Sequence, residues 1–359
     1  MSGKLVTRFL TEAEYPCWNE LVKSSPEGSI YSTPEYLDVL CGETAARFRI
    51  LVADRAGEIV GGIGLFERSA RWGTYATGRL LLYYNGIVLK PHTSKYPSEC
   101  TARQLETLTA LEEAITGIAY GRVEIKGRSS LSDVRVFIER GWRVSPSYSY
   151  VAPLTDPKAL WSRVEQNLRR LVGRCEREDV RFSDDDDFES FYRLHEQTHV
   201  RKGAALYLPE PGFRRFFERL RAQNLCRLFQ ARTAEGKVMA AQLVLLGSHP
   251  VCHTVSAATD VEFLKTGVTA FLRWKSFEHL AQMGYAGNDL TDAQLNPVTH
   301  FKSQLGGDLQ LNLVLRKPDR GGFRLENFVY RTGSVVKGGV RAALSPLQQA
   351  RKGSTKSTA

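Results

Sequence analysis

The chain has 359 residues, of which 42% are hydrophobic and 25% charged, and its formal net charge is +10. This composition is typical of a globular protein and excludes disordered and fibrous classes, and no apolar run approaches the roughly 18 residues that span a bilayer. The six cysteines lie far apart and form no CxxC pair, which argues against a zinc or disulfide framework and for a reducing cytosol.

Hydrophobic periodicity and turn residues predict the elements of the first 150 residues. Each period of about 3.6 indicates a helix, and each alternation indicates a strand. In chain order, the pattern predicts helices over 11–24 and 33–42, strands over 47–54 and 58–66, an extended segment over 79–90, a helix over 101–120, a strand over 122–126, a helix over 130–140 and a strand over 142–151.

The rest of the chain repeats this order. The predicted elements are helices over 156–178, 186–200 and 209–222, strands over 227–233, 237–246 and 251–258, a helix over 266–283, a strand over 286–290, a helix over 297–304 and a strand over 308–315. Two passes through the same order are difficult to obtain by chance. We therefore predict a duplicated α/β unit with a mixed sheet of the α+β type. The two copies would comprise residues 1–152 and 153–317, followed by a basic, flexible tail over 318–359.

Positive charge is concentrated at the C-terminal end. Residues 316–359 contain ten Lys or Arg and two Asp or Glu. Such a tail can bind an anionic membrane or RNA surface through its charge, or simply keep the protein soluble. The N-terminal residues lack the apolar core of a signal peptide. We expect a cytoplasmic protein that can lie at the inner face of the membrane, with no DNA partner.

One segment, HFKSQLGGDLQL over 300–311, reads as the end of a helix that continues through a glycine pair into a strand. Lys302 on the last helical turn either stabilises the helix C-terminus as a cation or points into a cleft where negative charge develops during a reaction. Gly306 and Gly307 either let the backbone approach a ligand closely or turn it sharply into the next strand.

A second segment, HEQTH over 195–199, matches the HExxH pattern of zinc hydrolases. His195 and His199 are one helical turn apart, so they can face one metal ion. However, Phe188 and Tyr192 continue the same stripe, which equally indicates a helix face packed in the core. The sequence has no third histidine in the extended form of the pattern, where Ala205 stands instead. We expect no metal site.

The element order, together with several motifs of the second half, resembles the GNAT acyltransferase fold. Its doubled form resembles the FemAB-like family and the acetyltransferase-6 domains grouped with it, without the long helical arm that FemA-type proteins often carry. The motifs cover roughly residues 150–315, whereas 1–150 resemble the family in element order alone. They are Trp161 in a basic helix, THVRKG over 198–203, GKVMAA over 236–241, Trp274 in the helix over 272–284, Asp289 at a strand end, and FKSQLGG over 301–307.

This resemblance implies tandem GNAT-like domains, an N-terminal one over 1–152 and a catalytic one over 153–317. It also implies that Lys302 stabilises the oxyanion of acyl transfer, because a fixed cation lowers the barrier where negative charge builds on a carbonyl oxygen. Asp289, Asp292 or His300 would accept the proton of the attacking amine, with strand-end placement favouring a positioning role for Asp289.

The resemblance also implies binding residues. Gly267 opens a helix whose N-terminus can bind the diphosphate of acyl-CoA beside Lys265 and Thr269. The loop lacks the leading Gln or Arg of CoA-dependent GNAT proteins, and Thr291 stands where the family often has glycine. The acceptor would be bound by Arg201, Lys202, Arg170 and Trp274.

The sequence therefore predicts an N-acyltransferase that moves an acetyl-type group from acyl-CoA to an amine of a cell-envelope or polysaccharide precursor, by direct attack. The main alternative is an aminoacyl-tRNA-dependent transferase that acts on a peptidoglycan-type precursor. More distant alternatives are a zinc hydrolase that uses residues 195–199 and a non-catalytic scaffold for envelope assembly.

Overall fold

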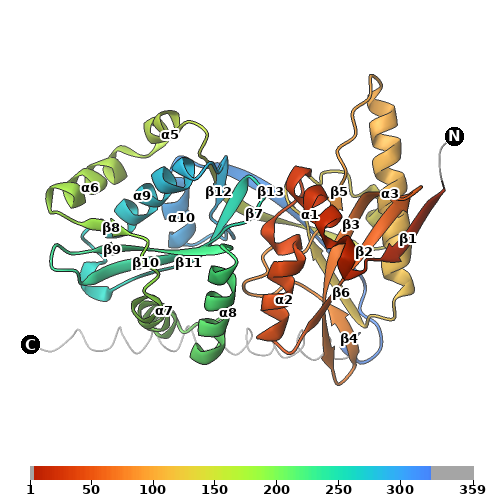
Figure 1. The fold of residues 1–359 in the computed structure, drawn as a ribbon, viewed down its shortest axis with the longest axis horizontal. Coiled ribbons are helices and arrows are strands. Elements are labelled where there is room, and N and C mark those ends of the chain that lie inside the picture. Colours follow the sequence, from red (N-terminus) through yellow and green to blue (C-terminus); the bar gives the residue numbers. More distant parts are fainter. Residues whose placement is uncertain (1–3, 325–359) are drawn as a thin grey trace, which may run out of the picture.

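The computed structural model describes residues 4–324, which form two lobes side by side (Figure 1). The lobes follow the two halves of the sequence, with the first half in red to yellow and the second in green to blue. Most of the predicted basic tail, residues 325–359, lies outside the described residues. The proposed division at residues 152 and 317 stays a prediction.

The first half contains seven strands and four α-helices within the described residues. The long α3 stands at the outer edge of this lobe (Figure 1). In chain order the elements are β1 (Leu5–Phe9), α1 (Tyr15–Ser24), α2 (Pro34–Gly42), β2 (Arg47–Arg55), β3 (Glu58–Ala70), β4 (Gly73–Ala76), β5 (Val88–Leu89), α3 (Pro97–Gly117), β6 (Arg122–Lys126), α4 (Arg135–Glu139) and β7 (Arg143–Pro153).

The second half repeats the hairpin, helix, strand, helix, strand order, which confirms the predicted tandem arrangement. Its elements are α5 (Pro157–Arg163), α6 (Gln166–Arg177), β8 (Arg181–Ser183), α7 (Phe188–Lys202), α8 (Glu210–Ala222), β9 (Cys226–Arg232), β10 (Val238–Leu245), β11 (Val251–Thr259), α9 (Val268–Gln282), β12 (Gly287–Asp289), α10 (Pro297–Ser303) and β13 (Asp308–Arg316).

The two halves exchange their last strands within one continuous mixed sheet. The strand order is β1-β2-β3-β4-β6-β13-β7-β12-β11-β10-β9-β8, and β5 pairs with β3 beside this path. β13 from the second half therefore pairs with β6 of the first half, and β7 from the first half pairs with β12 of the second. β13 and β7 also pair with each other along their lengths, from Asp308↔Val151 to Arg316↔Arg143. This exchange ties the lobes together through backbone hydrogen bonds.

Three predicted elements differ from the structure, and β1, β4 and β8 were not predicted. The predicted helix over 130–140 is helical only in α4. The segment 79–90 is extended only at β5, because residues 80–84 leave the sheet to contact the second half. Leu81 there adopts a positive φ of 71°, and its carbonyl accepts a hydrogen bond from the buried Tyr36 hydroxyl. The predicted helix over 156–178 is two helices, α5 and α6, because Val164 and Glu165 have extended backbone conformations between them.

The glycine pair before β13 serves the turn and not a ligand approach. Gly306 has φ 80°, in the left-handed region that favours glycine, and a Cβ there would lie 3.1 Å from the Leu160 carbonyl oxygen. A Cβ on Gly307 would lie 3.0 Å from the Val151 carbonyl oxygen. Close packing against α5 and β7 thus explains both glycines.

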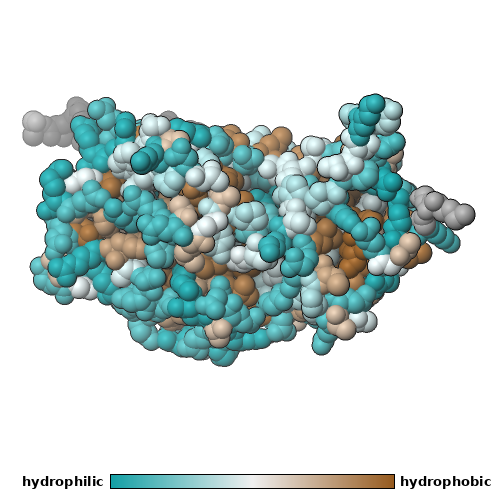
Figure 2. All heavy atoms as spheres, turned by 45° about the horizontal axis from the view of Figure 1, so that its top comes forward, coloured by the Kyte–Doolittle hydropathy of each residue, from teal (hydrophilic) through white to brown (hydrophobic). Residues whose placement is uncertain are grey.

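Hydrophobic side chains form a separate core in each half and a shared core between them. The shared core joins α2 and residues 81–84 to α7, α8 and the inner strands of the second half. On the outside, polar residues cover most of the face shown in Figure 2, and apolar residues gather in recesses of both lobes. Within residues 4–324, no helix combines the length and apolarity of a membrane span.

Candidate active site

A pocket opens where two parallel strands of the second half diverge. β11 pairs with β12 from Val251↔Gly287 as far as His253↔Asp289, and the pairing then stops. Residues that follow this paired region line a cavity of about 790 Å³, namely Thr254, Val255, Ser256, Ala257 and Thr259 after one strand and Thr291 and Asp292 after the other. This volume is within the range of roughly 300–1,000 Å³ of small-molecule sites. The ends of α7, α9 and α10 close the other walls.

The first half contributes to this pocket through the irregular segment before β5. Leu80 and Tyr83 line the cavity beside residues of the second half. The Tyr83 hydroxyl lies 3.3 Å from the Val255 carbonyl oxygen, to which it donates, and 3.4 Å from the Tyr207 hydroxyl. The pocket is therefore built by both halves.

Lys302 lies in the pocket wall and is only 8% exposed. Its Nζ donates hydrogen bonds to the carbonyl oxygens of Thr291 at 2.8 Å and Asp292 at 2.7 Å. An ammonium group has three donors, so one remains for a ligand. Burial, and after it the positive charge of Arg273, lower the pKa of Lys302 to about 8. The lysine is thus a fixed, partly desolvated cation and not a surface cap.

Asp289 holds the turn that presents those two carbonyls. Its Oδ1 accepts from the Thr291 amide at 2.7 Å, and its Oδ2 accepts from the Tyr84 hydroxyl at 2.8 Å. Thr291 has φ 53°, a left-handed conformation that is costly for a β-branched residue and needs such support. Burial raises the pKa of Asp289. Asp289 therefore acts on Lys302 through the backbone of this turn.

The N-terminal end of α9 forms another wall of the pocket. Gly267 has φ 92°, and a Cβ there would meet the Leu171 side chain at 2.7 Å, so both conformation and space favour glycine. Arg174 of α6 donates to the carbonyl oxygens of Lys265 and Thr266 and fixes the preceding loop. Thr269 shares a hydrogen bond with Thr259 at 2.8 Å between their hydroxyl oxygens.

The C-terminal end of α7 places the HExxH histidines on the same pocket. The Nδ1 of His195 lies 3.1 Å from the Ser256 hydroxyl, and Nδ1 of His199 donates to the Ala205 carbonyl at 2.8 Å. Burial lowers the pKa of His195 to about 3, so this ring is neutral. Among residues 4–324, no group of three His, Cys, Asp or Glu side chains converges as a metal site would require. Arg201 and Lys202, on the last turn, are exposed at the pocket mouth.

Six of the ten predicted site residues meet in this pocket, and four do not. The six are Lys302, Lys265, Gly267, Thr269, Arg201 and Lys202. Asp289 lies buried beneath the turn with 1% exposure, and His300 is on the exposed face of α10. Arg170 lies exposed on the outer side of α6, where its guanidinium bonds Asn167, and Trp274 packs in the core against Trp161 with ring centroids 4.3 Å apart.

The sequence prediction missed Arg273, which also lines the pocket. A local signal existed, because Arg273 interrupts the otherwise apolar run from Ala270 to Trp274 in the middle of a helix. Long charged side chains are rarely buried unless they are paired. An arginine at the position of an apolar residue is therefore a marker for a buried polar site.

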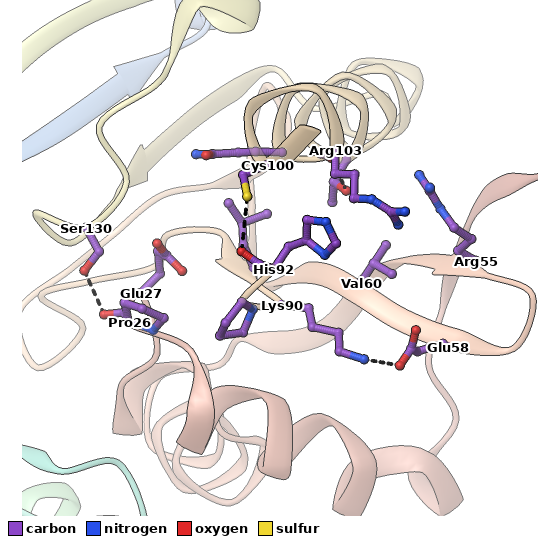
Figure 3. Close-up of a pocket in the computed structure, with 14 residues that line it drawn as sticks. Pro26, Glu27, Arg55, Glu58, Val60, Lys90, His92, Cys100, Arg103 and Ser130 are labelled. Atoms are coloured by element: carbon purple, nitrogen blue, oxygen red, sulfur yellow. Dashed lines mark hydrogen bonds and ion pairs between the residues drawn. The ribbon is translucent and has the colours of Figure 1, made fainter. Parts of the chain in front are cut away.

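The first half has a smaller pocket at the corresponding place, beside the first turns of α3 (Figure 3). Two of the basic side chains in its wall are paired with carboxylates. Lys90 pairs with Glu58, and Arg55 pairs with Glu106 on α3 at 2.5 Å. By contrast, the cations that line the pocket of the second half have no carboxylate partner among residues 4–324. The electrostatics thus favour the second half as the place where an anion or a developing negative charge is stabilised.

Comparison with known proteins gives one family and a set of similar structures. Residues 162–303 match the family described as acetyltransferase (GNAT) domain. A crystal structure of FemX is similar, with 13% identity, 86% of this chain and 96% of that chain covered, and a TM-score of 0.68.

Two further structures are similar over most of their lengths. A tandem GNAT protein from the clavulanic acid biosynthesis pathway has 13% identity, coverage of 89% of this chain and 99% of that chain, and a TM-score of 0.52. L-PGS from Bacillus licheniformis has 12% identity, coverage of 81% and 93%, and a TM-score of 0.50. At these identities the structures establish the fold. No curated protein matches the sequence.

Proposed function

We propose that this chain, a GNAT-superfamily acyltransferase with a FemAB-like fold, transfers an acyl group from acyl-CoA to an amine of a cell-envelope or polysaccharide precursor. The observation that supports it best is Lys302, whose ammonium is fixed by two backbone carbonyls inside a pocket large enough for a ligand. The envelope acceptor is suggested by FemX among the similar structures.

The geometry supports direct transfer without a covalent enzyme intermediate. The acceptor amine attacks the thioester carbonyl, so that a C–N bond forms, the C–S bond breaks, and the proton lost by nitrogen ends on the departing thiolate. The remaining N–H of Lys302 would donate to the carbonyl oxygen, where negative charge grows in the transition state. Because Asp289 and Thr291 fix the carbonyls that hold Nζ, little reorganisation is needed at that moment.

The residues at the start of α9 fit a CoA donor. The first amide groups of a helix lack intrahelical acceptors and favour anions such as a diphosphate. Gly267 begins α9 at this wall of the pocket, packed against Leu171, and the exposed Lys265 adds positive charge beside it. These residues would hold the diphosphate, while Lys302 would face the acyl carbonyl.

The donor can be tested by thermal unfolding of the purified protein with acetyl-CoA, CoA and charged tRNA. A ligand at 100 times its Kd stabilises the folded state by about 2.7 kcal/mol. We expect acetyl-CoA to raise Tm, whereas NaCl at the same ionic strength should leave Tm unchanged. If charged tRNA raises Tm and no CoA thioester does, the aminoacyl-tRNA-dependent alternative replaces this proposal. The exposed cations Arg201 and Lys202 at the pocket mouth are the observation that keeps this alternative open.

The pKa of Lys302 predicts opposite pH trends for activity and stability. Because the group must be charged to stabilise an oxyanion, we expect kcat to decline as pH rises through about 8. Between pH 8 and the ordinary lysine pKa of 10.5, the unfolded chain binds more protons than the folded protein, so the free energy of unfolding should rise with pH across this window.

Two measurements over pH 7–10 test this prediction, namely kcat at saturating donor and urea unfolding. Lys302→Arg serves as the control, because arginine stays protonated and should remove the declining limb of the kcat profile. If the decline of kcat with pH persists unchanged in Lys302→Arg, it comes from the titration of another group.

A further inference from the structure

Arg273 is a buried cation that has no carboxylate partner in the part of the chain that the structure describes. It is 8% exposed in the middle of α9, and neither Nε nor Nη1 has a hydrogen-bond partner among residues 4–324. A guanidinium group has five N–H donors, and leaving them unpaired in a protein interior is costly. Burial alone lowers its pKa, to about 10. Buried polar groups normally have a hydrogen-bond partner, which makes a bound ligand a candidate for these donors.

The charges around Arg273 also favour the binding of an anion. Lys302 shares its pocket, and the two positive charges repel each other. Among residues 4–324, Asp292 is the one carboxylate that lines the pocket. Its Oδ1 already accepts a hydrogen bond from the Lys126 Nζ at 2.7 Å. Arg201, Lys202 and Lys265 add further positive charge at the mouth. The cavity therefore has an excess of positive charge at its wall and at its mouth.

The position of Arg273 separates it from the proposed diphosphate site. Arg273 follows Val268, the first residue of α9, by five positions, which corresponds to about 7.5 Å along a helix axis. Lys302 in the same pocket is the group that we place at the reacting carbonyl. An anion bound by Arg273 would thus belong to the part of the substrate near the reaction centre and not to the diphosphate at the helix end.

We propose that Arg273 is a specificity-determining residue that binds a carboxylate or phosphate group of the substrate in the pocket of Lys302. The acyl group or the acceptor would then carry a negative charge close to the carbon that is transferred. This inference rests on the proposed acyltransferase function. The planar guanidinium can hold either oxyanion through two parallel hydrogen bonds, which an ammonium group cannot do.

The test uses small anions and is independent of the donor. Wild-type protein, Arg273→Met and Arg273→Lys are titrated with sodium succinate, sodium phosphate and CoA, with succinamide and NaCl at equal ionic strength as ligand controls. The readouts are Tm and the Kd from calorimetry. Arg55→Met is the matched control, because it removes a largely buried arginine from the other half.

We expect succinate or phosphate to raise the Tm of the wild type and of Arg55→Met more than succinamide and NaCl do. Arg273→Met should bind the anion on the order of 30-fold or more weakly, as truncation of a buried charge-pair partner typically does. In anion-free buffer, Arg273→Met should melt no lower than the wild type, because an unpaired buried cation has been replaced by an apolar group. Arg273→Lys should fold and retain only part of the affinity.

The ligands separate the sources of the anion. A response to succinate that is lost in Arg273→Met identifies a carboxylate, whereas a lost response to phosphate alone identifies a phosphate group. The proposal is wrong if Arg273→Met binds the anion as tightly as the wild type does. If the Met variant does not fold, the same comparison is made with Arg273→Lys. Failure of acetyl-CoA to bind, with the succinate response intact, would instead count against the donor assignment.

Discussion

Replacing Lys302 by Met is expected to lower kcat by about 10²–10³, the usual cost of removing one preorganised oxyanion donor. The side-chain stem is kept, whereas the charge and the hydrogen bonds to Thr291 and Asp292 are lost. Leaving buried carbonyl groups without donors should also lower the free energy of unfolding by about 1–3 kcal/mol. Initial-rate kinetics with the CoA donor that gives the largest thermal shift, together with urea unfolding, measure both effects.

The stability loss needs a control, because a destabilised enzyme can lose activity for that reason alone. Lys317→Met removes another partly buried lysine, one whose Nζ donates to Thr116 in the first half at 2.6 Å. We expect it to change stability without changing kcat. Lys302→Arg should restore the charge but little of the rate, because a broad planar group replaces a compact one. A Lys302→Met enzyme that turns over at the parental rate would reduce this lysine to a structural role.

The architecture could be predicted from the sequence because it follows from local patterns repeated twice. Alternation and helical periodicity depend on neighbours in the chain, and they identified the hairpins, α9 and β13 within a few residues. The strand exchange could not be predicted in this way. Nothing in the sequence of residues 308–316 distinguishes a strand that pairs within its own half from one that pairs with β6. Such pairing depends on residues nearly 200 positions away.

The site was only partly predictable for the same reason. Lys302 and Gly267 belong to short motifs, so their positions relative to a helix end could be inferred from the chain itself. Tyr83 reaches the pocket from the first half through an irregular segment that reads as a strand. Trp274 and Arg273 are adjacent in sequence but point to different surroundings, one to the core and one to the cavity. Which of the two side chains faces the cavity depends on how α9 is rotated about its axis against the sheet.

Replacing Leu315 by Ala should destabilise the protein by about 2–5 kcal/mol, as is typical of fully buried leucines. Leu315 belongs to β13 of the second half, yet its side chain is 0% exposed in the core of the first half, where its strand pairs with Ile125 of β6. The exchanged strand thus completes the core of the other half. Urea unfolding gives the magnitude, and hydrogen exchange followed by mass spectrometry locates the effect.

The location of the effect distinguishes an exchanged strand from two self-contained halves. In Leu315→Ala, amides of β6 and α3 should lose protection at least as much as those of α9, because the cavity opens beneath the first-half sheet. Leu311→Ala is the matched control, since this leucine lies on the same strand but is 49% exposed and should cost little. If protection is lost only in α9 and α10, β13 stabilises only its own half, and the strand exchange does not couple the stability of the two halves. If both halves respond together, the pocket between them is held by one cooperative unit, and a substrate bound there stabilises the whole chain.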